Sequence, residues 1–421
     1  MIKSLKNKIN LSNFQKNIIS MLKGNSIAQI ISVIGALIIA KTYGSNAYGI
    51  YAVYLSISGI LAIPNTLQLE YAIVLSNSKN IGKQIMSSIL VIPLLISIFY
   101  LFILYIFSGE IDQHANKITL FTAILGAILM AQNKGLIAFL TIQKKFKYLA
   151  NSKIITSIST VVFQLLLFNY FKSEGLIIGS LIGVFITFIY LIKLNWKSIS
   201  KFSIVKLARS IAKHQNLVKF GLLSNLINAL ANNIIPILIL TYFSSSQSGT
   251  YALSIKILVT PLFLISSAIF QVYFEKASKL FKFSKEKLYQ FTKQIVWSNS
   301  LIMLTILLSI NLLGVRLLTY FFDESWKDMS TFILLLSFLV LARSTFNPIS
   351  SIVEITKRNH IDLIFNSYLL IINLIGFYIG YIYNDLIYMI VLITILGSIG
   401  YLVILWYFLR LLKSYSLITK F

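Results

Sequence analysis

Long apolar segments separated by short polar stretches follow one another along almost the whole chain. A helix needs about 20 residues to cross the hydrocarbon core of a bilayer, and twelve segments come near this length. The predicted spans are residues 19–41, 48–70, 84–108, 118–142, 154–171, 175–194, 217–243, 249–274, 294–320, 329–353, 361–382 and 386–410. The pattern therefore predicts an all-α integral membrane protein with about 12 transmembrane helices, the fifth and sixth forming a tight hairpin.

Composition supports this class and removes several kinds of chemistry. Hydrophobic residues make up 57% of the chain and charged residues 12%, whereas soluble domains carry about 25% charged residues. The absence of cysteine excludes disulfides, thiolate metal sites and thiol nucleophiles. The histidines His114, His214 and His360 lie too far apart in sequence to suggest metal ligands. Neither a metal nor a cofactor is indicated.

The net charge of +25 would suit a nucleic acid, but its distribution favours a membrane. With twelve spans, most of the 37 Lys and Arg residues fall on the side that holds both termini, in residues 1–17, 144–153, 193–219 and 276–293 and at the C-terminus. Acidic residues gather on the opposite side, among them Glu110, Asp112, Asp323, Glu324 and Asp328. By the positive-inside rule both termini are cytoplasmic, with the basic surface against anionic membrane lipids. Nucleic acid is the weaker interpretation.

A short block of sequence recurs at a spacing of 200 residues. Residues 49–52 read Gly-Ile-Tyr-Ala and residues 249–252 read Gly-Thr-Tyr-Ala. Because six spans precede the second copy, both halves enter the membrane from the same side, as in a parallel repeat. We expect two pseudo-symmetric six-helix bundles, residues 1–194 and 217–421, around a central cavity. Between them, residues 195–216 are expected to be a cytoplasmic linker containing an amphipathic helix, although an ordinary basic linker accounts for them equally well.

Three cations lie inside apolar segments, namely Lys134, Lys256 and Arg343, and no acid is expected at matching depth. A charged side chain at the centre of a membrane helix costs at least about 2.5–3.5 kcal/mol, so such residues normally face a polar cavity or a partner. We predict that these three bind substrate. The alternative is that they snorkel toward the interface or pair with backbone carbonyls.

Polar amides accompany the cations on two helices. Asn25 and Gln29 are followed by Ser32 on one face of the first span, and Asn225, Asn228 and Asn232 share one face of the seventh. A cavity lined by amides, hydroxyls and cations suits a sugar headgroup that bears a phosphate or carboxylate. In the alternative interpretation, these amides only hydrogen-bond neighbouring helices.

Catalysis is disfavoured by the loops and by the acids. The predicted outer loops are short, and Glu70, Glu354 and Asp362 all fall near predicted cytoplasmic ends of spans. No span carries the paired carboxylates that acid catalysis or a metal would use. Asp112 with His114 is the one outer cluster that would serve a polysaccharide polymerase or glycosyltransferase, which stays the alternative from a different class. A transporter is the better prediction.

Two stretches carry a resemblance to a known family. AKTYGSNAYGIYAVYLSISGIL (40–61) followed by LEYAIVLSNSK (69–79), and SGTYALSIKILVTPLFLISSAIFQVYFEKAS (248–278), resemble bacterial polysaccharide exporters of the O-antigen flippase (Wzx-like) type. These belong to the multidrug/oligosaccharidyl-lipid/polysaccharide (MOP) exporter superfamily. In that family a basic residue commonly follows the Gly-x-Tyr-Ala block, and Lys256 matches it here.

The resemblance implies a substrate and a mechanism. The substrate is an undecaprenyl-diphosphate-linked oligosaccharide, moved across the bacterial inner membrane by alternating access and coupled to an ion gradient. Partners implied are a polysaccharide polymerase and other assembly proteins. Glu70 falls in the family-like stretch, where an ion pair at the cytoplasmic face is its expected role. A small-molecule or drug antiporter of the same superfamily, or a lipid II flippase, are the alternatives within transport.

Overall fold

The computed structural model describes residues 13–76, 78–106, 117–215 and 217–418. Within these ranges every regular element is a helix, as the sequence predicts. The α-helices are α1 (Asn13–Thr66), α2 (Leu69–Val74), α3 (Lys79–Ile106), α5 (Lys117–Ile142), α6 (Phe146–Phe171), α7 (Gly175–Asn195), α8 (Ile204–Lys213), α9 (Leu222–Tyr242), α10 (Ser245–Phe283), α11 (Lys285–Ser309), α12 (Val315–Phe321), α13 (Met329–Phe346), α14 (Ile352–Ile355), α15 (Asn359–Ile382) and α16 (Leu386–Ile418). Short 3-10 or π turns are η1 (Lys172–Glu174), η2 (Trp196–Ser198), η3 (Leu217–Gly221), η4 (Ile310–Gly314), η5 (Glu324–Trp326) and η6 (Asn347–Ile349).

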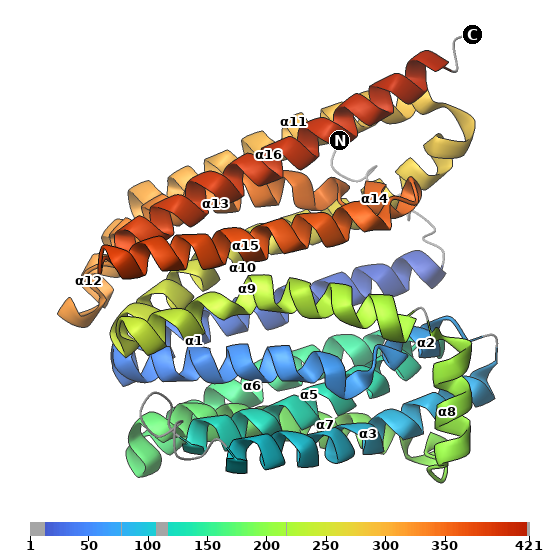
Figure 1. The fold of residues 1–421 in the computed structure, drawn as a ribbon, viewed down its shortest axis with the longest axis horizontal. Coiled ribbons are helices and arrows are strands. Elements are labelled where there is room, and N and C mark those ends of the chain that lie inside the picture. Colours follow the sequence, from blue (N-terminus) through green and yellow to red (C-terminus); the bar gives the residue numbers. More distant parts are fainter. Residues whose placement is uncertain (1–12, 77, 107–116, 216, 419–421) are drawn as a thin grey trace, which may run out of the picture.

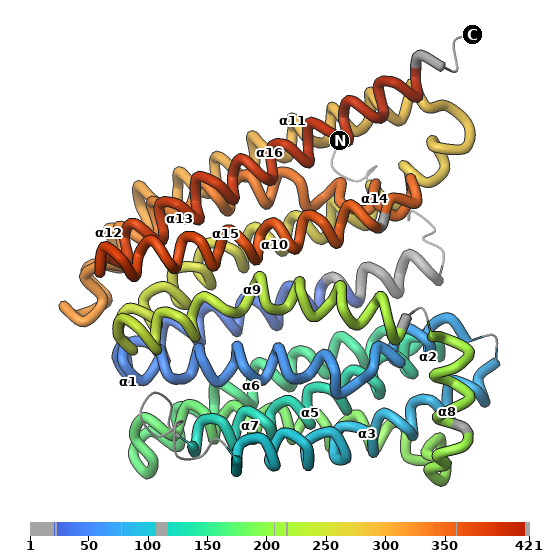
Figure 2. Tube along the Cα trace, viewed as in Figure 1, coloured from blue at the N-terminus to red at the C-terminus, as the bar shows by residue number. Residues whose placement is uncertain are grey.

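Twelve membrane spans follow from these helices. Ten apolar helical stretches in the described residues are long enough to cross a bilayer, and two of them are hairpins. The stretch Phe146–Ser198 holds α6 and α7, which are separated by η1. The stretch Lys23–Thr66 turns at Gly44, whose φ of 77° and ψ of 170° are not helical. Glycine reaches positive φ without a steric penalty, and Figure 2 shows the chain reversing there.

The helices form two groups that meet at one end and diverge toward the other (Figure 1). α1, α3, α5, α6 and α7 pack together in one group, whereas α10, α11, α13, α15 and α16 pack in the other. α9 lies between α1 and α15. The diverging ends each have a separate apolar core, one around Phe139 and Leu191 and the other around Phe346 and Phe408.

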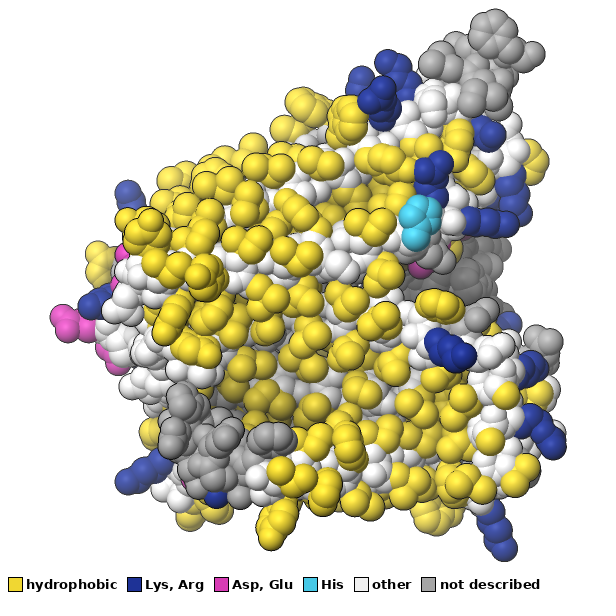
Figure 3. Space-filling view, viewed as in Figure 1, with side chains coloured by type: hydrophobic (Ala, Val, Ile, Leu, Met, Phe, Trp, Pro, Cys, Tyr) yellow, Lys and Arg dark blue, Asp and Glu magenta, His cyan; other side chains and the backbone are white. Residues whose placement is uncertain are grey.

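Charge marks the two ends of the molecule. On the face seen in Figure 3, hydrophobic side chains cover the middle, and Lys and Arg gather at the end toward which the two groups diverge. We call this the basic end, and it includes α8 and α14. The opposite end, which we call the acidic end, holds the turn at Gly44 and the acids of residues 323–328.

A short helix, α8, crosses the basic end next to α3 (Figure 1). It occupies the segment in which an amphipathic helix is predicted. Leu207 and Ile211 pack against the core around Phe139, and Arg209 and Lys213 are exposed. Lys3, Lys6 and Lys8 of the predicted basic arm, and the loop with Glu110, Asp112 and His114, lie outside the described residues.

Candidate functional site

The two copies of the sequence repeat meet at the acidic end. A β-carbon on Gly49 would lie 1.9 Å from the carbonyl oxygen of Ser245, and one on Gly249 would lie 2.1 Å from that of Ser45. No other residue type fits without a shift of the backbone. The repeat therefore marks a place where α1 and α10 touch main chain to main chain.

Hydrogen bonds between hydroxyls and an amide reinforce this contact. Ser45 Oγ and Ser246 Oγ share a hydrogen bond of 2.7 Å, and Ser245 Oγ donates to Asn46 Oδ1 at 2.9 Å. Ser246 Oγ also donates to the carbonyl of Ser325 at 3.2 Å. Each bond joins elements about 80 to 200 residues apart in sequence, so the acidic end is held closed by both halves.

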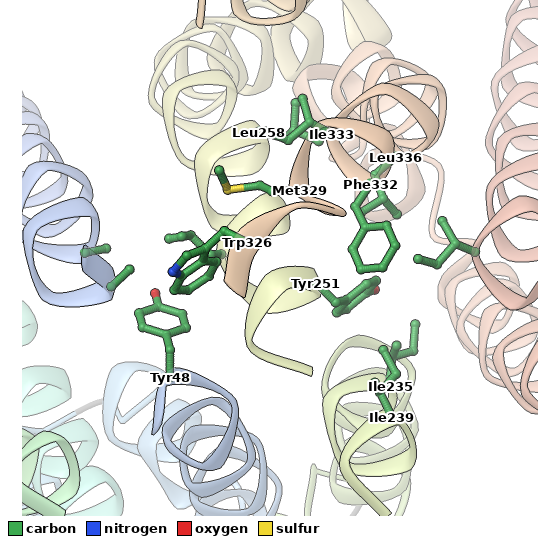
Figure 4. Close-up of a cluster of buried hydrophobic side chains, with 14 of the residues drawn as sticks. Tyr48, Ile235, Ile239, Tyr251, Leu258, Trp326, Met329, Phe332, Ile333 and Leu336 are labelled. Carbon is green, nitrogen blue, oxygen red and sulfur yellow. The ribbon is translucent and has the colours of Figure 1, made fainter. Parts of the chain in front are cut away.

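An apolar cluster lies just inside this contact (Figure 4). The ring of Tyr48 on α1 faces Trp326 of η5 edge-on, with 5.9 Å between ring centroids. Tyr251 of α10, Phe332 of α13 and Ile239 of α9 complete the cluster and are all buried. Tight packing of this kind excludes water, and it closes the acidic end against the passage of a polar molecule.

Lys256 lies about 16 Å along the axis of α10 from its first residue. The side chain contributes to the wall of a cavity of about 130 Å³ between α10 and the opposite group of helices. The remaining lining comes from α1 and α6, namely Ser32, Ala36, Ile39, Tyr48, Tyr51, Thr156, Ser157, Thr160, Val161 and Gln164. No Asp or Glu lines the cavity. Lys256 and Ser32, both predicted from sequence to face the interior, therefore line the same cavity from the two groups of helices.

Asn25 and Gln29 continue the same face of α1 toward the basic end. Gln29 lies one turn and Asn25 two turns beyond Ser32. This polar face is opposite to the face with the exposed, apolar Ile30 and Ile34. Asn25 Oδ1 and Gln29 Oε1 are buried and have no hydrogen-bond partner in the protein. An unsatisfied buried acceptor costs about 1–3 kcal/mol, so a donor from a bound molecule or from water would stabilise either atom.

The α9 asparagines bond to other partners. Asn225 Nδ2 donates to Gln68 Oε1 at 3.0 Å, and Asn228 Nδ2 donates to Asn366 Oδ1 of α15 at 2.7 Å. Asn232 Nδ2 donates to the carbonyl of Asn228 at 2.7 Å. None of the three lines the Lys256 cavity. For Asn225 and Asn228, the hydrogen bonds to neighbouring helices match the structural alternative considered from sequence.

Asn228 and Asn232 nevertheless point inward. They share one face of α9 with Ile235 and Ile239, at spacings i, i+4, i+7 and i+11. The two isoleucines are buried in the core between the groups, whereas the two asparagines are exposed. Because the face is the same, the asparagines are exposed where the two groups diverge and not toward lipid.

Arg343, in the last turn of α13, is away from Lys256. Its guanidinium lies within electrostatic range of the phenols of Tyr251 and Tyr401, and Tyr401 is also within range of Asp362. Arg343 is therefore set among aromatic and acidic groups of its own half. The sequence predicts that Arg343 binds substrate together with Lys256, and the cavity that contains Lys256 does not include Arg343.

Lys134 requires a correction, because the expectation that no acid lies at its depth is wrong. Glu70 of α2 lies within electrostatic range of Lys134 on α5. The second span does not continue to residue 70: Leu67 and Gln68 have φ of 50° and 60°. These left-handed residues end the helix and turn α2 back against α5.

At the basic end, the carboxylates of Glu70 and Glu354, one from each half, act on the same tyrosine. Tyr71 lies within electrostatic range of both Glu70 and Glu354, the latter on α14. Burial raises the pKa of Tyr71, and these two carboxylates raise it further. The short helices α2 and α14 thus bring one carboxylate from each half toward the same phenol.

The α6 side of the cavity is missing from the sequence interpretation. Thr156, Thr160 and Gln164 recur at i, i+4 and i+8, so one face of the fifth span is polar. This periodic stripe was the available signal. Asn366 and Asn373 on α15 are likewise buried, at i and i+7, and bond to α9.

Metal ligands are not gathered anywhere in the part of the chain that the structure describes. No group of three His, Cys, Asp or Glu side chains lies close enough to hold an ion. The polar residues at the interface are amides, hydroxyls and cations, which suit recognition of a polar or anionic molecule.

Solved structures share this architecture. The lipid II flippase MurJ in an inward closed conformation has a TM-score of 0.74 and 16% identity, covering 95% of this chain and 91% of that one. A multidrug resistance MATE family transporter of the MOP superfamily, inward-facing, has a TM-score of 0.65 and 15% identity, covering 94% and 99%. A MOP superfamily transporter from Pyrococcus furiosus, whose binding pocket is described as having reverse polarity, has a TM-score of 0.56 and 15% identity, covering 95% and 96%. The predicted MOP fold of two bundles and twelve helices is confirmed.

Among curated proteins, none matches the chain in sequence. A family model described as polysaccharide biosynthesis protein matches residues 38–331, which is more than half of the chain. The chain therefore belongs to the polysaccharide biosynthesis protein family.

Proposed function

We propose that this protein is a flippase for an undecaprenyl-diphosphate-linked oligosaccharide repeat unit of the O-antigen or capsule type. The observation that carries the proposal is an interface closed at the acidic end and polar but free of carboxylates around Lys256. Membership of a polysaccharide biosynthesis family and the fold likeness to a lipid II flippase support the same substrate class. The membrane is the bacterial inner membrane, with the basic end and both termini in the cytoplasm.

The substrate headgroup contacts both cations and amides. Lys256, with Lys134 and Arg343 as helpers, attracts the diphosphate or acidic sugars, since charge-assisted hydrogen bonds to phosphate are stronger than neutral ones. Asn25 and Gln29 offer oxygens that have no protein partner, and sugar hydroxyls donate to such groups. The amides of Asn225, Asn228 and Asn232 on α9 also contact sugar hydroxyls.

The prenyl tail requires an apolar path beside the headgroup site. A second cavity, of about 670 Å³, lies between α10, α1 and α6. Its apolar wall comes from Met21, Phe146, Phe270, Phe274 and Phe283, and Glu275, Lys279 and Lys282 line it as well. Phe270 and Phe274 stack with 6.2 Å between their centroids. We assign this cavity to the tail, which then stays in contact with lipid while the headgroup enters between the halves.

Transport then consists of rocking one half against the other. We propose that residues 1–194 and 217–421 are the moving units and that residues 195–216 connect them. The glycine contact at the acidic end breaks when the outer side opens, and the basic end closes in exchange. An ion gradient supplies the energy, and a polymerase and other assembly proteins use the exported unit.

A small-molecule antiporter is the second candidate, because one neighbour in fold is a multidrug resistance transporter. A site for organic cations needs negative charge, and the Lys256 cavity has an ammonium and no carboxylate. This chemistry favours an anionic substrate. A polymerase or glycosyltransferase stays the alternative from a different class.

The test is surface polysaccharide in a host that lacks its own O-antigen flippase and carries the sugar-assembly genes neighbouring this one. Restored surface polymer, with lipid-linked units no longer accumulating, is the expected result. Lys256→Ala should abolish restoration and Lys256→Arg should preserve most of it. Lys276→Ala serves as the matched control, because Lys276 is exposed on the same helix. Accumulation of lipid-linked units despite membrane expression would contradict the proposal.

A further inference from the structure

Lys256 carries a charge that no protein group balances. Within the described residues it makes no hydrogen bond and no ion pair, and no carboxylate lines its cavity. An ammonium in the low-dielectric interior of a membrane protein is costly without a partner. Lys256 is half-buried, and the closed acidic end keeps bulk water from the cavity on that side, so an anion within the cavity would balance its charge.

Three hydroxyls around the ammonium are also without protein partners. Ser32 on α1 and Ser157 and Thr160 on α6 line the cavity and make no hydrogen bond to any described residue. Thr156 differs, since its hydroxyl already donates to the carbonyl of Ser152 at 2.8 Å. Lys256, Ser32 and Ser157 thus line one small space from three helices, whereas Thr160 Oγ1 lies against Gly183 of α7.

The size of the space limits what it can hold. The cavity volume is about 130 Å³, and one water occupies about 30 Å³ of liquid. A monovalent anion with a few waters fits in this space. Donors without a carboxylate favour an anion over a cation.

We propose that the Lys256 cavity is a binding site for a small inorganic anion of the chloride type, occupied while the acidic end is closed. The ammonium of Lys256 supplies the charge, and the hydroxyls of Ser32 and Ser157 donate to the anion. The site exists whether or not the protein moves a lipid-linked sugar. If the substrate diphosphate reaches Lys256, it displaces the anion.

The experiment measures thermal unfolding of the purified full-length protein as sodium chloride replaces sodium gluconate at constant ionic strength. A ligand that binds the folded state raises the unfolding temperature in a saturable way, here by about 1–3 °C. Sodium bromide should act similarly. Lys256→Gln should lose the response, and Lys276→Gln, on the same helix, should keep it.

Variants that leave the charge in place guard against misfolding of Lys256→Gln. Ser32→Ala combined with Ser157→Ala should weaken the apparent chloride affinity about tenfold. A wild-type protein with the same unfolding temperature in gluconate and chloride overturns the site, and so does an unchanged response in Lys256→Gln. Export is measured separately: export by the wild type without a chloride response refutes only the anion site, and the reverse refutes only the flippase.

Discussion

The acidic end and the Lys256 cavity lie on the same helices, α1 and α10, and are built in opposite ways. At the acidic end Gly49 and Gly249 bring the two backbones into contact, and serines bond across the interface. At the cavity, about three turns along α10, hydroxyls and an ammonium face each other without bonding. One interface is completed by the protein alone, whereas the other is completed by what it binds. Closure should therefore depend on the close fit of the two backbones at the glycines, and binding should depend on the charge and hydroxyls of the cavity.

The largest effect should come from breaking the shape of the closed end. A β-carbon in Gly49→Ala would lie 1.9 Å from the carbonyl of Ser245. Overpacking of this kind costs about 2 kcal/mol, which is about thirtyfold in the population of the closed state. Because the chain has no cysteine, closure can be measured as disulfide formation in a Ser45→Cys/Ser246→Cys variant.

The matched control for this substitution is Gly59→Ala, whose β-carbon would have only Asn233 Oδ1 nearby, at 3.9 Å. Cross-linking should stay at the wild-type rate in that variant and fall at least tenfold in Gly49→Ala. Equal rates in both would contradict the assignment of the glycine contact as the closing surface.

A smaller effect should come from the charges at the basic end. Glu70→Gln removes the carboxylate near Lys134, and we expect a loss of about 1 kcal/mol in unfolding free energy. A double-mutant cycle with Lys134→Gln should show that the two losses are not additive. Additive losses would mean that the two charges do not interact.

The hydrogen bond between the side-chain amides of α9 and α15 should matter less for stability than for transport. Asn228→Leu removes the 2.7 Å bond to Asn366, which is worth about 0.6 kcal/mol in a membrane protein. Export should nevertheless fall at least threefold if this exposed face contacts sugars. Leu223→Ala, on an exposed position of the same helix, is the control. A loss of export no greater than that of the control would return Asn228 to a purely structural role.

The smallest effect is expected at the exposed ion pair of α10. Lys279 Nζ lies 2.8 Å from Glu275 Oε1, and both side chains are about 70% exposed. Such i, i+4 pairs contribute at most about 0.5 kcal/mol. The unfolding free energy of Lys279→Ala should equal that of the wild type within error, and a larger loss would show that Lys279 has a contact beyond this pair.

Hydrophobic spacing predicts the spans because a bilayer requires a fixed length of apolar helix, whatever its neighbours. It also predicts that Lys256 and Ser32 face the interior, since a charge and a polar stripe are costly in lipid. The sequence could not predict that Lys256 shares a cavity with Ser157 and Thr160. Hydroxyls in a helix normally satisfy themselves with the preceding turn, as Thr156 does, and only packing decides which stay free.

Backbone turns set the other limit. The hydrophobic pattern predicts that Glu70 ends the second span. In the structure, its approach to Lys134 depends on the left-handed conformations of Leu67 and Gln68. Neither residue type favours that conformation, so local sequence gives no sign of the turn. The repeat, by contrast, is visible in the sequence itself as a spacing of 200 residues, although the sequence does not show that Gly49 and Gly249 touch.

The reciprocal glycine contact also constrains how this chain can change over generations. The room beside Gly49 is set by the backbone of Ser245, and the room beside Gly249 by the backbone of Ser45. No side-chain substitution in one copy of the repeat can make space for a larger residue in the other, because main-chain atoms are the obstacle. Any codon change that adds a side chain at either glycine therefore requires a shift of the backbone in the opposite half.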